Sequence, residues 1–276
     1  MASRTIEPAA FERLWEAMRA AYNAAIDTDE PEAVLELIDM WIECWRGVDP
    51  IPEGARVLQL ALPGTFWARD ELEAAAYAEA LVDLGRRCES PDDVAIVRAL
   101  TEAYANVAET TSTPERTRQA ADAAGICAAR LTHPDPVVDA ELARALRNLA
   151  VDLDELSSRV EIATWLRELS GRQLEPVCSI DEHLSVALVC LSRSLGRGNA
   201  EHLGIVHELA ALHHRWPLSL RIAGDYVGET WNAYVCGGLD EPPVELLERF
   251  ETIRSSLPQL NDNIERALHY LRGELD

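Results

Sequence analysis

The sequence contains no lysine, and all 25 of its basic residues are arginine. Without lysine the chain has no Schiff-base nucleophile, no phosphate-loop lysine and no lysine general base. Acidic residues number 48, so the formal net charge is -23 at pH 7. A GC-rich genome or adaptation to a salty cytoplasm would each remove lysine. The acidic surplus favours a halophilic protein that loses structure at low salt, because salt screens the repulsion between surface carboxylates.

Clusters of positive charge are also missing. Arg86 and Arg87 are the only adjacent arginines, and they lie at the predicted end of a helix. Nucleic acids and anionic membrane surfaces are bound through clustered basic side chains. We therefore expect no nucleic-acid partner and no attraction to a bare membrane surface.

Long apolar runs and paired cysteines are absent as well. No stretch reaches the ~18 apolar residues of a membrane helix, and residues 1–4 show no apolar signal region, so we expect a cytoplasmic protein without membrane insertion. The six cysteines include no Cys-x-x-Cys pair. Cys127 and Cys190 lie within apolar helical patterns and are predicted to be small buried residues.

Sequence motifs of catalysis are not found. The chain has no Gly-x-Ser-x-Gly and no His-Glu-x-x-His motif. Its one glycine-rich candidate, residues 196–199, follows a helix, whereas a dinucleotide-binding loop must follow a strand. We expect no catalytic residues and no cofactor.

What the chain does contain is a helical motif repeated every 42 residues. Its copies begin at residues 103, 145 and 187, and a shorter copy covers residues 231–234. The same motif position is occupied, at steps of 42 residues, by Asn106, Asn148, Cys190 and Asn232. A fixed period of about 20–50 residues is typical of stacked supersecondary units.

Start and stop signals divide the chain into helices whose starts lie roughly 20–24 residues apart, so two helices make one repeat. Strand-like alternation does not occur. The predicted helices cover residues 7–26, 31–46, 66–87, 92–109, 114–131, 136–153, 158–170, 180–195, 200–215, 220–236, 243–256 and 262–272. Their predicted N-cap residues include Ser90, Thr113, Asp135, Ser158, Ser179, Asn199 and Ser219.

These signals predict an all-α fold, a right-handed α-solenoid of stacked antiparallel helix pairs. Residues 1–65 are expected to form less regular helices and a loop. Residues 66–276 are expected to form the solenoid with a C-terminal capping helix, and the two parts to make one continuous domain. Residues 180–195 are apolar on most sides, which predicts a helix buried on both sides.

Residues 142–150 and the helix that follows them resemble the 42-residue, tetratricopeptide-like units of the kinesin-light-chain type. The resemblance extends over residues 92–256. In that family the first helix of each pair lines a concave groove, and an asparagine before a Leu-Ala step bonds the main chain of a bound peptide. The matching residues here are Asn106, Asn148 and Asn232, whereas Cys190 departs from the pattern. The family's second-helix glycine and aromatic are poorly matched, so HEAT-type and armadillo-type pairs remain open.

The resemblance implies a groove lined by carboxamides, which suit a peptide main chain because each offers donors and an acceptor. A mid-helix asparagine can instead bond a neighbouring helix or face water. The predicted partner-binding residues are Asn106, Asn148, Asn232, Arg144, Arg147 and Asp225.

Four histidines fall in the predicted helix 200–215, at His202, His207, His213 and His214. Helical metal pairs prefer a separation of three or four residues, and these separations differ, so no metal site is expected. His213 is predicted to be a hydrogen-bonded interior or groove residue that titrates near neutrality.

Two carboxylate pairs have the i, i+4 spacing of a magnesium-diphosphate site, Asp135 with Asp139 and Asp225 with Glu229. Asp135 precedes a proline and also has the features of a helix cap. The favoured function is a non-catalytic adaptor or scaffold that binds a peptide or protein segment on its concave face. The alternatives are an assembly subunit that forms homo-oligomers through its helical faces, and a magnesium-dependent isoprenoid-type enzyme.

Overall fold

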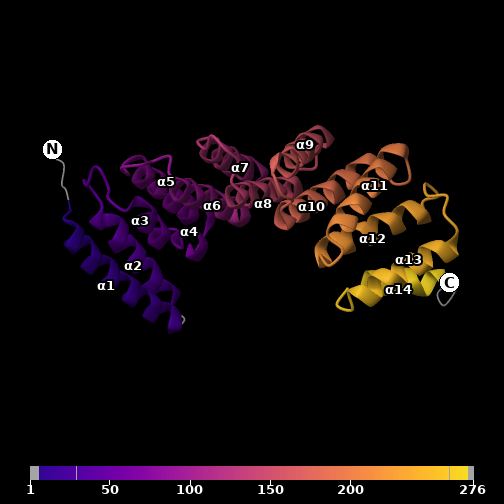
Figure 1. Ribbon diagram of the computed structural model, residues 1–276, viewed down its shortest axis with the longest axis horizontal. Coiled ribbons are helices and arrows are strands. Elements are labelled where there is room, and N and C mark those ends of the chain that lie inside the picture. The colour runs from indigo at the N-terminus through magenta and orange to yellow at the C-terminus, as the bar shows by residue number, and fades with distance from the viewer. Residues whose placement is uncertain (1–5, 29, 261, 273–276) are drawn as a thin grey trace. The chain divides into compact units, whose positions relative to one another are not determined.

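The structure is a computed structural model that describes residues 6–28, 30–260 and 262–272, with the main chain alone for residues 262 and 263. Every regular element in these residues is an α-helix, which confirms the predicted all-α class (Figure 1). The β-contact that is present is an isolated bridge between Ile51 and Cys88. Among the described helices, none combines the length and the apolar character needed to cross a membrane.

The chain divides into an N-terminal unit, residues 1–149, and a C-terminal unit, residues 150–276. The N-terminal unit contains α1 (Pro8–Asp27), α2 (Pro31–Cys44), α3 (Gly54–Ala61), α4 (Gly64–Trp67), α5 (Glu71–Arg86), α6 (Val94–Thr110) and α7 (Pro114–Ala128). The boundary falls within α8 (Pro136–Asp152). The C-terminal unit continues with α9 (Leu156–Arg172), α10 (Cys178–Leu195), α11 (Ala200–Arg215), α12 (Leu220–Val235), α13 (Pro243–Ser256) and α14 (Asp262–Leu271).

Predicted and observed helix ends agree within three residues outside residues 47–87. The predicted helix 66–87 is wrong at its start, because α4 ends at Trp67 and α5 begins at Glu71. Asp70 causes the break. Its main chain is extended (φ -153°, ψ 174°), and its carboxylate accepts hydrogen bonds from the N–H groups of Leu72 and Glu73. A residue in this conformation caps a new helix.

Several predicted N-caps are confirmed by their hydrogen bonds. The side chains of Asp135, Asn199 and Ser219 accept bonds from N–H groups in the first turns of α8, α11 and α12. The predictions of Ser158 and Ser179 are wrong, since α9 and α10 begin upstream of them. Ser158 is the third residue of α9 and Ser179 the second of α10, so in both cases the serine and the acid three residues later lie inside the first turns of the helix, where the same sequence pattern also occurs.

The predicted N-cap Ser90 is also wrong. The N-cap of α6 is Asp93, whose Oδ1 accepts a hydrogen bond of 2.8 Å from the N–H of Ala95. Residues 90–93 instead form a turn closed by the bond from the N–H of Asp93 to the carbonyl of Ser90, 3.0 Å.

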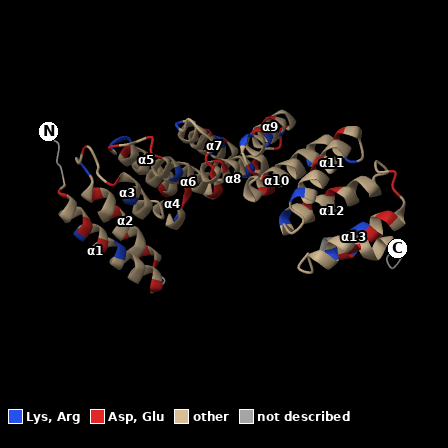
Figure 2. Cartoon of the chain, viewed as in Figure 1, with Lys and Arg blue, Asp and Glu red and all other residues tan. Residues whose placement is uncertain are grey.

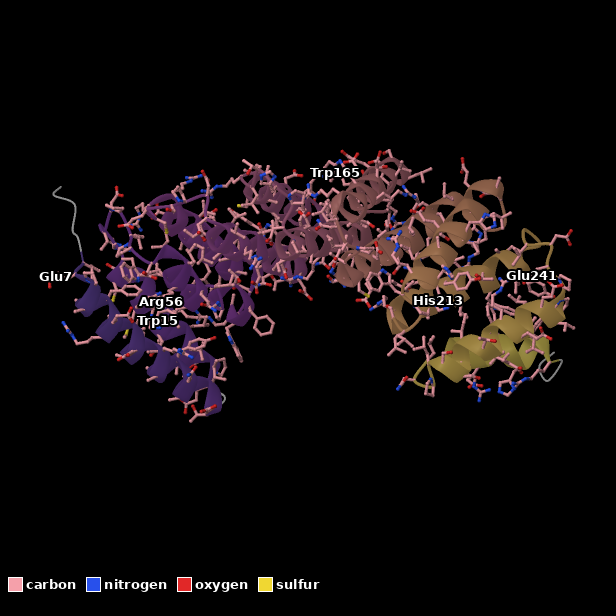
Figure 3. All side chains as sticks on the ribbon, in the orientation of Figure 1. Glu7, Trp15, Arg56, Trp165, His213 and Glu241 are labelled. Atoms are coloured by element: carbon pink, nitrogen blue, oxygen red, sulfur yellow. The ribbon has the colours of Figure 1, made fainter. Side chains whose placement is uncertain are left out.

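Aromatic residues fill the core of the N-terminal unit near α1 and α2. Trp41 and Trp45 are fully buried, and their ring centroids lie 5.2 Å apart in an edge-to-face arrangement. The indole N–H of Trp41 donates to the carbonyl of Val57 in α3, at 2.9 Å. At the edge of this cluster the guanidinium of Arg56 lies 4.7 Å from the centroid of the Trp15 ring (Figure 3). Large apolar burial of this kind is the main source of folding free energy.

The core of the C-terminal unit is centred on α10, which contacts α9, α11 and α12. Leu184 and Leu188 are buried on one face of α10. On the opposite face Cys190 is buried, whereas Val186 and Val189 are partly exposed, so the predicted burial on both sides is only partly confirmed. The same helix also buries polar side chains, Asp181, Ser185 and Ser192. Buried polar groups need hydrogen-bond partners, so they restrict which helix can pack against α10.

Within each unit, helices contact helices that are close to them in sequence. In the N-terminal unit α2 contacts α4 and α4 contacts α6, and in the C-terminal unit α10 contacts α12 and α12 contacts α14. Many side-chain hydrogen bonds between helices join residues 34–45 positions apart. Typical separations are 38 for Tyr77 with Asp39, 41 for Arg167 with Glu208, and 40 for Ser185 with Asp225. These contacts show that helices pack in sequential order along the chain within each unit.

Candidate functional site

The predicted residues Asn106 and Arg144 contact each other inside the N-terminal unit. Asn106 is buried, and its Nδ2 donates to the hydroxyl of Thr65 at 2.9 Å. Its Oδ1 accepts a hydrogen bond of 2.7 Å from Arg144. Both ends of this carboxamide are therefore engaged within the protein, which is the structural role open to a mid-helix asparagine.

Arg144 is the centre of a polar network on α8. It donates to Glu141 at 2.6 and 2.8 Å and to Glu109 at 2.7 Å, in addition to Asn106. These contacts join α8 to α6. The next predicted residues on α8, Arg147 and Asn148, are half-buried. The Nδ2 atom of Asn148 is shielded from solvent and has no hydrogen-bond partner within the described residues.

The remaining positions of the 42-residue column lie in the C-terminal unit. Cys190 is buried, as predicted, and so is Cys127 in the N-terminal unit. Asn232 is half-buried, and its Nδ2 donates to Oε1 of Glu229 at 3.3 Å. The four positions of the column therefore have different environments.

Asp225, the sixth predicted residue, lines a cavity of about 480 Å³ in the C-terminal unit. The cavity lies between α12 and the segment formed by Gln259, Leu260 and Ile264, where α14 begins. Leu220 and Val227 complete its aliphatic walls, and the polar groups at its surface belong to Arg221, Asp225 and Gln259.

The Asp225 carboxylate is half-buried and has a single hydroxyl donor. Its Oδ2 accepts a hydrogen bond of 2.7 Å from Ser185 on α10. Burial raises the pKa of Asp225 above the usual range for aspartate, against the opposing effects of the Ser185 bond and Arg221. Loss of hydration disfavours the ionised form, and one hydroxyl replaces only part of the lost water.

A second buried carboxylate, Glu229, belongs to a network that the sequence did not predict. Its Oε2 accepts hydrogen bonds from the hydroxyl of Ser192 and from Nε2 of His202, the latter at 2.9 Å. The Nδ1 atom of the fully buried His202 accepts a bond of 2.9 Å from the N–H of Gly198. This acceptor role leaves the ring proton on Nε2, so His202 is neutral and donates to Glu229. The sequence held one hint of this network: Ser192 and Glu229 are 37 residues apart, which is close to the 42-residue period.

His213 lies at the edge of a different cluster. Its ring stacks on Tyr226 at 5.5 Å, and its Nδ1 is shielded without a hydrogen-bond partner among the described residues. Burial, with a smaller effect of His214, lowers the pKa of His213 below its usual value. The Tyr226 hydroxyl accepts a bond of 3.0 Å from Arg249, which also donates to Glu241.

One member of each predicted carboxylate pair, Asp135 and Glu229, is engaged by several protein contacts. Asp135 caps α8 and forms a two-bond ion pair with Arg98, at 3.0 and 2.7 Å. Glu229 accepts from Ser192 and His202 as described. The part of the chain that the structure describes contains no group of three or more histidine, cysteine, aspartate or glutamate side chains placed to hold a metal ion.

A smaller cavity, about 310 Å³, lies in the N-terminal unit between α5, α6 and α7. Leu72, Val107 and Ala120 contribute apolar walls, and Glu71 and Arg116 lie at its surface. Glu71 and Arg116 form an ion pair with each other. Arg116 is therefore already engaged by Glu71, and Glu79 adds a further negative charge to this lining.

Arginines and acidic residues lie side by side along the helices of both units (Figure 2). Comparison of the chain with protein-family models, with curated proteins and with solved structures finds no match. The described residues define an all-helical protein in which consecutive helices pack together.

Proposed function

We propose that this protein is a non-catalytic adaptor that binds a peptide or protein segment on the faces of its helix pairs. In this proposal each unit is a stretch of right-handed, tetratricopeptide-like α-solenoid. The separations of 34–45 residues in side-chain bonds between helices support it, since they lie close to the 42-residue sequence period. In a solenoid each repeat contacts only its neighbours, so contacts recur about one repeat apart.

The observation that carries the binding role is the cavity at Asp225. Asp225 lies seven residues before Asn232, and two helical turns place both residues on one side of α12. The cavity volume of about 480 Å³ is within the range of about 300–1,000 Å³ that ligand sites occupy. Aliphatic walls with a few polar groups are also typical of such sites.

The chemistry of the cavity favours binding over catalysis. Its polar lining consists of a carboxylate, a guanidinium and a carboxamide, from Asp225, Arg221 and Gln259. Covalent catalysis needs a nucleophile in hydrogen-bond contact with a base, and the hydroxyl that bonds Asp225, that of Ser185, is not part of the cavity lining. The three polar side chains of the lining can accept and donate hydrogen bonds to a main chain or to a charged side chain.

Selection from a random peptide library displayed on phage, with the full chain as bait, tests the adaptor role. We expect a consensus sequence to emerge. The Gly224→Leu variant should lose the selected peptides, because Gly224 lines the cavity and a Cβ there already lies 3.7 Å from Leu260. The added side chain would fill the space a peptide needs.

The matched control is Gly204→Leu on α11. A Cβ at Gly204 has no neighbour within 4 Å, so the same leucine is added to a helix in open space. This variant should retain binding. Absence of any consensus, or equal binding by Gly224→Leu and the wild type, would contradict the adaptor proposal at this site.

A further inference from the structure

Asp225 differs from the other buried carboxylates of the C-terminal unit in how many donors it has. Asp181 accepts hydrogen bonds from Ser170 at 2.5 Å, Arg215 at 2.8 Å and Trp216 at 2.7 Å. A carboxylate can accept about four hydrogen bonds, so Asp181 is nearly satisfied.

Glu229 is similarly well supplied, with Ser192, His202 and Asn232 as donors. Among the described residues the half-buried Asp225 accepts from Ser185 alone. It therefore keeps acceptor capacity, and it lines a cavity that is open to a ligand. A donor that enters the cavity would replace the hydration that Asp225 lost on folding.

The sign of the missing donor group follows from the charges around the cavity. Asp225 is held in place by Ser185, whereas Arg221, one turn earlier on α12, is exposed and keeps its hydration. An anion at Arg221 would gain little, because an exposed ion pair is screened by water. A cation at Asp225 gains more, since the interaction is stronger where water is partly excluded. The net charge of -23 also concentrates cationic ligands near the protein.

The walls define what must accompany the cation. Leu220, Val227, Leu260 and Ile264 provide aliphatic surface around the carboxylate. The methylene stems of arginine and lysine pack on such surface while their charged ends reach a carboxylate. The volume of about 480 Å³ also leaves space for a neighbouring aliphatic residue.

We propose that the cavity between α12 and α14 binds an arginine or lysine side chain of a partner peptide, with the charge at Asp225 and a flanking aliphatic residue against the walls. This assignment rests on the proposed adaptor function and adds the chemistry of the partner. Arg221 then acts as a filter, because its charge repels the incoming cation and lowers the affinity for basic peptides.

The test is a phage-display selection with wild-type chain, Asp225→Asn and Arg221→Gln as separate baits, all drawn from one random library. With the wild type we expect enrichment of peptides in which arginine or lysine is adjacent to leucine, isoleucine or valine. The selected peptides are then synthesised and titrated by calorimetry. Asp225→Asn should weaken binding about tenfold or more, because a charge contact changes affinity by such a factor where water is partly excluded. Arg221→Gln should strengthen binding by a smaller factor, about twofold, because the charge of the exposed Arg221 is screened by water.

Opposite signs in the two variants separate the possible ligands. Enrichment of acidic residues or free C-termini, with Arg221→Gln weakening binding, would overturn the cation assignment and leave the adaptor role intact. A consensus unaffected by Asp225→Asn would do the same. No consensus with any bait would contradict both proposals. The fold of each variant is checked by circular dichroism, and Asp225→Asn keeps an acceptor for Ser185, so its folded state should persist.

Discussion

The two units of the protein bury polar groups in different ways. The N-terminal unit places indole rings in its core and keeps its ion pairs near the surface, as in Arg98 with Asp135, where the arginine side chain is 43% exposed. Among the described residues the N-terminal unit buries one carboxylate, Asp139 at 1% exposure, whereas the C-terminal unit buries two, Asp181 at 1% and Glu229 at 5%. A core of rings is stabilised by area, whereas a buried carboxylate is stable only while each of its donors remains. With two such carboxylates against one, the C-terminal unit should be the more sensitive to polar substitution and to pH.

The largest effect is expected for Trp41→Ala in the N-terminal unit. This change removes a fully buried indole and its hydrogen bond to Val57, and the loss should be about 3–5 kcal/mol of unfolding free energy. Hydrogen exchange followed by mass spectrometry measures each unit separately, through its own peptides. Protection should fall in residues 8–67. A loss of protection confined to the C-terminal unit would contradict the conclusion that the indole core stabilises the N-terminal unit.

Asp181→Ala should be the most damaging polar truncation in the C-terminal unit. It leaves Ser170, Arg215 and Trp216 without their acceptor, and we expect a cost of about 2–3 kcal/mol. The control is Asp83→Ala in the N-terminal unit, where an exposed aspartate pairs with Arg87. That change should cost about 0.5 kcal/mol or less. Equal costs for the two variants in urea denaturation would remove the distinction between the units.

A pH effect is predicted for His213. Its folded-state pKa is lowered by burial, so below the ordinary value of 6.5 the unfolded chain binds more protons than the folded one. Stability is therefore lost as pH falls through the unfolded-state value. His213→Phe keeps a ring against Tyr226 and should recover part of the stability lost at pH 5, with little change at pH 8.

The matched control for this pH profile is His207→Phe, an exposed position on the same helix. It should leave the dependence on pH unchanged. Of the seven histidines only His133, which is exposed, lies in the N-terminal unit, so that unit should show no such loss between pH 7 and pH 5. A parallel loss in both units would point to a cause other than His213.

The smallest difference is expected for two similar ion pairs, one in each unit. Arg98 donates twice to Asp135, and Arg167 donates twice to Glu208, at 2.8 Å in both bonds. Both arginines are partly exposed, so Arg98→Ala and Arg167→Ala should each cost about 0.5–1 kcal/mol, less in high salt. A markedly larger cost in the C-terminal unit would show that the units differ in more than their buried carboxylates.

The positions of the helices could be predicted because their signals are local. Proline, glycine and capping side chains act within one turn, as at Asp135 and Asn199. The failures at Ser158 and Ser179 arose where hydroxyl and acid lie within the helix and satisfy the same pattern. Asp70 was overlooked because an apolar pattern on both sides obscured a single cap.

The candidate site was predicted less well, because its properties depend on neighbours distant in sequence. Asp225 is one of the predicted partner-binding residues, yet nothing in the sequence of its helix indicates the cavity or the single donor, Ser185, on another helix. The repeat position of Asn106 predicts a partner-binding residue, but in the structure its amide bonds Thr65 and Arg144. A repeat position shows which side of a helix a residue occupies, but its partners are supplied by the packed neighbours.

The sequence by itself determined the helical class, the order and ends of most helices and the acidic surface, since composition and one-turn signals depend on few residues. Only the tertiary structure decided which carboxylates are buried, which are fully bonded, and that Asp225 faces a cavity with acceptor capacity left. The reason is physical: burial and hydrogen bonding are shared between helices about one repeat apart, and such pairs are established only when the helices pack.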